Sequence, residues 1–70
     1  MKEYTDINGI KVKENDLIKT ETYKGGCYRV VMIQLGTGLG IKIKEKKSAL
    51  LGTLKNIRIM TKENDPECFL

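Results

Sequence analysis

The chain has 70 residues, of which 40% are hydrophobic and 31% are charged, and its thirteen Lys and Arg outnumber nine Asp and Glu to give a net charge of +4. This length allows one small domain at most, and the apolar content predicts a folded body. No apolar run is long enough to cross a membrane, and Lys2, Glu3 and Asp6 interrupt the segment that a signal peptide would keep apolar. We therefore expect a cytoplasmic protein without a membrane segment.

Two tight turns are predicted in the first eighteen residues. Asn8-Gly9 can supply both positive-φ residues of a type I′ hairpin turn, and Glu14-Asn15-Asp16 reads as a second reversal. Between them, residues 10–13 alternate apolar and Lys side chains, which favours a short, half-buried strand. The chain therefore begins with closely spaced reversals around extended backbone.

The next two segments are predicted to pair as a hairpin. Residues 17–23 are rich in β-branched and aromatic side chains and end at Lys24-Gly25-Gly26, where the chain can reverse. Residues 27–35 carry apolar side chains on both faces, which is typical of a central strand covered on both sides or coiled across a barrel. We take this segment as the core strand.

The second half of the chain contains two further alternating segments. Residues 39–44 follow Gly36-Thr37-Gly38 and alternate apolar side chains with Lys or Gly, and residues 56–60 read as a closing strand. Between them lie a charged turn at 45–48 and an apolar run at 49–54 that is consistent with either a strand or a helical turn. Pro66 lacks a backbone N–H and marks the end of regular structure.

Together these segments predict an all-β or mainly β fold, a small SH3-like barrel of about five short antiparallel strands, because closure removes exposed edges in so small a chain. We assign residues 1–63 to the barrel and 64–70 to a C-terminal tail. The predicted core consists of Ile10, Val12, Ile18, Tyr28, Val30, Met32, Leu39, Ile41, Ile43, Leu54, Ile57 and Ile59.

The opening pattern Asp6-x-Asn8-Gly9-x-x-Val12-x-Glu14-Asn15-Asp16-Leu17-Ile18 resembles the N-terminus of the YopX-like proteins, a family of small phage and prophage proteins. The segment Glu63-Asn64-Asp65-Pro66-Glu67 is similar to a motif near the C-terminus of that family, with Asp65 as an extra residue. The resemblance implies an SH3-like fold and a phage or prophage origin in a bacterial host cell. It implies no activity, because the family has none established.

Most sequence features that resemble catalytic, phosphate-binding or metal-binding motifs have a structural explanation. The glycines at 36–40 precede an alternating strand where a phosphate-binding loop would need a helix, so a hairpin turn is favoured. Asp6, Glu14 and Asp16 sit in turns, where Asp commonly accepts hydrogen bonds from nearby backbone. With no His and only Cys27 and Cys68, the chain offers neither an ordinary zinc site nor a thiol with its base. We predict no catalytic residue, no metal site, no cofactor and no enzyme activity.

A basic surface is the first candidate binding site. If the fourth and last predicted strands are close, one face gathers six cationic residues, namely Lys42, Lys44, Lys46, Lys47, Lys55 and Arg58. Such a face could bind nucleic acid through its phosphates, although eleven Lys and two Arg favour general electrostatic contact over base reading. The alternative is an ordinary solvated face, and few aromatic residues are present for base stacking.

The tail is the second candidate. Phe69 and Leu70 end the chain with apolar side chains that could pack on the barrel, dock on a host or phage protein, or contact a second copy of the chain. A disulfide between Cys27 and Cys68 would require the tail to fold back, and thiols inside cells usually stay reduced, so Cys27 is read as a small apolar filler.

The sequence therefore predicts a non-catalytic protein-interaction module that binds an unknown phage or host protein. The alternative is an accessory protein that binds nucleic acid through the Lys-rich face. Clustering of those Lys residues on one face would favour the second function.

Overall fold

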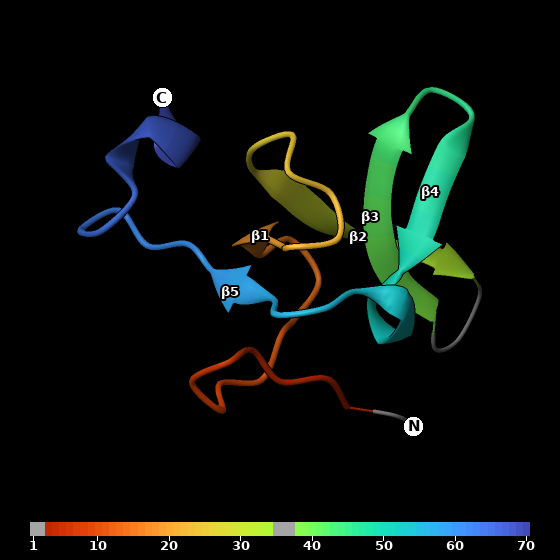
Figure 1. The fold of residues 1–70 in the computed structure, drawn as a ribbon, viewed down its shortest axis with the longest axis horizontal. Coiled ribbons are helices and arrows are strands. Elements are labelled where there is room, and N and C mark those ends of the chain that lie inside the picture. The colour runs from red at the N-terminus through yellow and green to blue at the C-terminus, as the bar shows by residue number, and fades with distance from the viewer. Residues whose placement is uncertain (1–2, 35–37) are drawn as a thin grey trace.

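The computed structural model describes residues 3–34 and 38–70 of the chain. Its described part is mainly β: five strands form one antiparallel sheet, together with two short 3-10 helices (Figure 1). The strands are β1 (Leu17–Lys19), β2 (Tyr28–Gln34), β3 (Gly38–Lys44), β4 (Lys47–Leu50) and β5 (Arg58–Ile59), and the helices are η1 (Leu51–Thr53) and η2 (Pro66–Phe69). The predicted mainly β class is confirmed, whereas closure into a barrel stays a prediction.

The sheet has the order β4-β3-β2-β1-β5, and every neighbouring pair is antiparallel. In the long β2–β3 pair, Val30 lies opposite Ile41 and Val31 lies opposite Gly40. On the other side of β3, Ile41 faces Ala49 and Gly40 faces Leu50. Because neighbouring side chains on a strand point to opposite faces, this register directs Val30, Ile41 and Ala49 to the core face and their neighbours to the outer face.

The N-terminal turn differs from the predicted type I′ turn. Gly9 has φ 79°, but Asn8 is not in the left-handed region. The backbone N–H of Asp6 donates to Ile10 O at 2.8 Å, and that of Gly9 donates to Asp6 O at 3.0 Å. This arrangement matches a three-residue hairpin loop with its left-handed Gly in the last position. The side chain of Asp6 stabilises it, because Oδ1 accepts hydrogen bonds from Asn8 N and Ile10 N.

The second predicted turn is confirmed, but the strand between the two turns is not. Asn15 has φ 77°, and the Asp16 N–H donates to Lys13 O at 3.2 Å. The predicted strand around residues 10–13 is reduced to one antiparallel bridge between Thr5 and Lys11. Ile10 is 57% exposed, so its assignment to the core is wrong, whereas Val12, two residues later, is buried.

The core gathers buried side chains from β1, β2, β3 and the loops. Its members are Val12, Ile18, Val30, Ile41, Leu51 and Ile57, with the predicted core residues Tyr28, Leu39, Ile43, Leu54 and Ile59 half-buried around them. Two corrections concern hydrophobic residues. Met32 was predicted to be in the core but is 47% exposed. Leu51 and Met60 were not predicted to be in the core, but both are buried. Leu51 reaches the core because the ambiguous run 49–54 ends β4 and then forms helix η1.

The predicted closing strand at 56–60 is shortened to β5, but hydrogen bonds outside the ladder extend its attachment to β1. Met60 N–H donates to Leu17 O at 2.8 Å, and Thr20 Oγ1 donates to Lys55 O at 2.7 Å. The predicted turn residues 36 and 37 lie outside the described residues. Within residues 3–34 and 38–70, no helix is long and apolar enough to span a membrane.

Candidate functional site

The outer face of the β2–β3–β4 sheet carries apolar side chains that the core does not use. Val31 lies opposite Gly40, and Gly40 lies opposite Leu50 on β4, so the three positions share this face. Ile33 reaches across it, because its Cδ1 atom occupies space that a Cβ at residue 40 would need. Val31, Ile33 and Leu50 are each half-buried. Strand β2 is therefore apolar on both faces, as its sequence predicted, although the buried core lies on one of them.

A cleft opens on this face and combines an apolar floor with a polar rim. It has a volume of about 400 Å³ and is lined by Val31, Met32, Ile33, Lys42 and Ser48. Lys42 and Ser48 face each other across the β3–β4 pair, and both are exposed. The cleft can therefore accept an apolar group while an ammonium and a hydroxyl remain available at its edge.

Strand β4 lies beside the cleft at one end of the sheet. It pairs with β3 on one side, and within the described residues no strand pairs with its other side. Backbone N–H and C=O groups along such an edge can pair with another extended chain. The cleft and the open edge are therefore adjacent features of the same β3–β4 hairpin.

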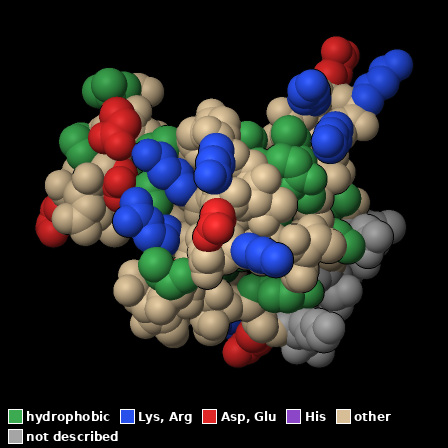
Figure 2. Space-filling view, in the orientation of Figure 1, with side chains coloured by type: hydrophobic (Ala, Val, Ile, Leu, Met, Phe, Trp, Pro, Cys, Tyr) green, Lys and Arg blue, Asp and Glu red, His purple; other side chains and the backbone are tan. Residues whose placement is uncertain are grey.

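The predicted basic set divides into two groups. Lys42, Lys44, Lys46 and Lys47 belong to the β3–β4 hairpin, whereas Lys55 and Arg58 lie at or before β5, at the opposite end of the sheet. Figure 2 shows Lys and Arg side chains gathered at the tip of the β3–β4 hairpin and others over the middle of the molecule, with neutral and apolar surface between them. The single basic face required β3 and β5 to lie close together, but strands β2 and β1 separate them in the sheet.

A second basic region, which the sequence analysis missed, surrounds Tyr23. The Lys47 ammonium lies 5.5 Å from the centre of the Tyr23 ring, in cation–π geometry. Tyr23 also lines a cavity of about 220 Å³ together with Lys19, Thr20, Lys24 and Gly26. These lysines come from β1, the loop after it and β4, so no local sequence pattern could have grouped them.

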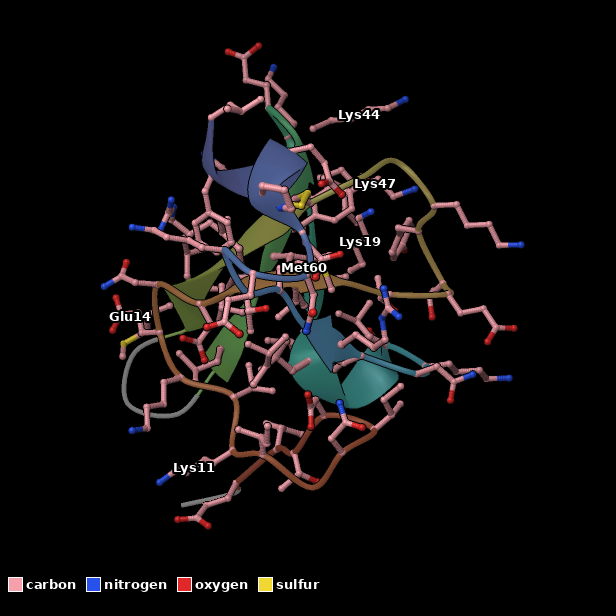
Figure 3. All side chains as sticks on the ribbon, turned by 90° about the vertical axis from the view of Figure 1, so that its left-hand side faces the viewer. Lys11, Glu14, Lys19, Lys44, Lys47 and Met60 are labelled. Atoms are coloured by element: carbon pink, nitrogen blue, oxygen red, sulfur yellow. A yellow bond between two sulfur atoms is a disulfide. The ribbon has the colours of Figure 1, made fainter. Side chains whose placement is uncertain are left out.

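The carboxylates at the N-terminal turns have structural roles. Asp16 Oδ2 accepts a hydrogen bond from Lys13 N at 2.8 Å, and Asp6 Oδ2 accepts one from Ile59 N at 3.3 Å. Burial raises the pKa of Asp6, but backbone hydrogen bonds from Ile10, Ile59 and Asn8 outweigh that effect and hold its pKa below the ordinary value. Glu14 is exposed and points away from the sheet (Figure 3). Within the described residues, no three acidic or Cys side chains gather in a way that could hold a metal ion.

The C-terminal tail turns back toward the start of β2, and Cys27 and Cys68 form a disulfide with a Cα–Cα distance of 5.9 Å (Figure 3). The interpretation of Cys27 as an apolar filler with a free thiol is therefore wrong for this structure. The tail returns because a turn, closed by the Asp65 N–H bond to Thr61 O, reverses the chain after β5. Phe69 is 39% exposed and Leu70 is fully exposed, so the two residues predicted to dock remain largely at the surface.

Comparison of the chain with protein-family models, curated proteins and solved structures finds no match. The fold and the surfaces described above are therefore the basis for any functional assignment.

Proposed function

We propose that this protein is a non-catalytic protein-interaction module that binds an extended, acidic segment of a partner protein along the β3–β4 hairpin. One observation carries the proposal: β2 presents Val31 and Ile33 to the outer face, where they line an open cleft beside the edge of β4 that no described strand pairs with. A strand that is apolar on both faces is normally covered on both. The proposed partner covers part of this face with an apolar side chain.

The binding mode follows from the two adjacent features. An extended segment that adds to β4 gains backbone hydrogen bonds, and alternate side chains of that segment point toward the outer face. A long apolar side chain of that segment would reach over β4 and enter the cleft from the side of Ser48. The affinity of the partner segment would come from the backbone pairing, and its specificity would come from the side chain that fits the cleft.

The charge of the hairpin selects the chemistry of the partner. Lys42 lines the cleft, and Lys44, Lys46 and Lys47 lie around the hairpin tip. Within residues 38–50, all of which the structure describes, Glu45 is the only acidic residue. Carboxylates flanking the apolar side chain would therefore be attracted to the site. A second copy of the chain is disfavoured on this surface, because a two-fold contact would bring two Lys-rich hairpins together.

The test is selection from a displayed library of random 12-residue peptides, followed by affinity measurement with purified peptides. We expect enrichment of peptides that combine acidic residues with a central apolar residue. Lys42→Glu should weaken their binding by about tenfold, equivalent to about 1.4 kcal/mol. Lys62→Glu is the matched control, since it makes the same charge change at an exposed position after β5. No enrichment, or equal losses in both variants, would contradict the proposal.

Nucleic-acid binding is the second candidate function. The neighbouring Lys47 and Tyr23 favour it, because a cationic group can contact a phosphate while an aromatic ring stacks on a base. The division of the predicted basic set weakens it. A pulldown from bacterial host lysate with and without nuclease separates the two functions, because a direct protein complex survives the treatment. The resemblance of the terminal motifs to the YopX-like proteins supports a phage or prophage origin, and the composition supports a cytoplasmic location.

A further inference from the structure

The Cys27–Cys68 disulfide joins two parts of the chain that otherwise have little contact. Cys27 lies directly before β2, and Cys68 lies in η2, 41 residues later. We call residues 61–70 the C-terminal segment. The last backbone hydrogen bond that ties the chain to the sheet before this segment runs from Met60 N to Leu17 O, and Met60 itself is buried.

Beyond Met60, the hydrogen bonds within the described residues are local. Asp65 N donates to Thr61 O, Asn64 N donates to Thr61 Oγ1, and Cys68 N donates to Asp65 O. No residue of η2 is buried. Local bonds shape the C-terminal segment but do not attach it to the sheet, so its position depends on contacts made by its side chains.

Among the described residues, the ion pair from this segment to the sheet joins Lys19 Nζ and Glu67 Oε1 at 3.7 Å. The two side chains are 38% and 59% exposed, and ion pairs at such sites contribute little because water and salt screen them. The disulfide is covalent and is therefore the stronger of these two attachments. It also holds the Glu67 carboxylate beside Lys19, at the rim of the cavity that contains Tyr23.

We infer that the Cys27–Cys68 disulfide is a redox-controlled attachment for the C-terminal segment: its reduction frees residues 61–70 while the five-stranded sheet stays folded. The sheet is expected to persist because the core cluster of Val12, Ile18, Val30, Ile41, Leu51 and Ile57 contains no residue of the segment. Release also removes Glu67 from Lys19, which leaves the cavity beside Tyr23 more positive.

The redox step needs a dithiol reductant. One of its thiolates attacks a sulfur of the Cys27–Cys68 bond, which breaks to give a mixed disulfide and a protein thiolate. The second thiol of the reductant then attacks the mixed disulfide and closes its own S–S bond. Two electrons pass from the reductant to the protein, and the two cysteines leave as thiols after proton uptake.

The test uses the full-length chain labelled with ¹⁵N and measures amide order parameters before and after treatment with dithiothreitol. In the oxidised protein, residues 61–68 should be as ordered as the strands. After reduction, their order parameters should fall below about 0.6, which marks flexible backbone, while the amide signals of Val30 and Ile41 stay dispersed. Cys68→Ser should reproduce the reduced state without reductant.

Lys19→Ala provides the matched control, because it removes the ion pair and leaves the disulfide intact. The segment should remain ordered in this variant. The inference is overturned if the segment stays ordered after reduction or if Lys19→Ala alone releases it. It is also overturned if reduction or Cys68→Ser unfolds the core, because the disulfide would then be required for folding. Failure of glutathione disulfide to reoxidise the reduced protein would overturn it as well.

Discussion

Ile33 lies over Gly40 on the neighbouring strand, and the two residues fit because Gly40 has no side chain on the outer face of the sheet. A Cβ at residue 40 would overlap both Ile33 Cδ1 and the backbone carbonyl of Ala49 on β4. Gly40→Ala should therefore lower the free energy of unfolding by about 1–3 kcal/mol, the usual cost of overpacking. Urea denaturation measures the change, and Ser48→Ala at an exposed position of β4 is the control. Equal midpoints for the two variants would contradict this packing.

Ile41 and Ile10 test the boundary of the core with the same substitution. Ile41 is fully buried, whereas Ile10 is 57% exposed. Ile41→Ala should destabilise the protein by about 2–5 kcal/mol through lost burial and a residual cavity. Ile10→Ala, at an exposed site, should change stability by no more than about 0.5 kcal/mol. Thermal or urea denaturation of both variants measures the difference, and a similar loss for each would show that the N-terminal loop packs differently.

Asp6 should make stability depend on acidic pH. Its pKa in the folded protein is lowered from the ordinary value of 3.8, because backbone hydrogen bonds outweigh the effect of burial. The unfolded state therefore binds a proton more readily, so the stabilisation is complete above pH 3.8 and is lost as pH falls through the lower, folded pKa. Asp6→Asn removes this charge while keeping one side-chain oxygen. Its stability should vary less between pH 5 and pH 2 than that of the parent protein, and parallel curves would refute the assignment.

Thr20 should contribute to the attachment of the segment before β5. Its hydroxyl is buried and donates to Lys55 O at 2.7 Å, while its oxygen accepts a hydrogen bond from Thr22 N at 3.3 Å. Thr20→Val preserves the side-chain shape but removes both of these hydrogen bonds, so it should cost about 1–3 kcal/mol. Hydrogen exchange of the Glu21 amide, which also donates to Lys55 O, should become faster. Unchanged exchange and stability would exclude this role.

The strands that the sequence predicted best are those with strong local patterns. The alternation of Ile41, Lys42 and Ile43 identified β3, and the apolar run around Val30 identified β2, because side-chain period and β-branching are properties of a few adjacent residues. The turn at Asn15 was also predictable, since Asn tolerates the left-handed conformation found there. By contrast, Ile10 and Val12 have the same local pattern, yet only Val12 is buried, because only a single bridge forms around that segment.

The candidate site depended more strongly on tertiary structure. The sequence showed that β2 is apolar on both faces, but it could not show which face the core would cover. The strand order separated Lys42 from Arg58, whereas the three-dimensional fold brought Lys47 of β4 to Tyr23 after β1, although two strands lie between β4 and β1 in the sheet. Neither relationship is encoded in any short segment.

The amino-acid sequence by itself determined the small size, the basic charge, the mainly β class and the positions of most turns, because each follows from composition or from residues adjacent in the chain. Tertiary structure alone decided the order of the strands, the open cleft beside β4 and the return of Cys68 to Cys27 across 41 residues. Those features depend on how segments far apart in the sequence pack around one small core. The pairing of β1 with both β2 and β5 then limits where the two ends of the chain can lie.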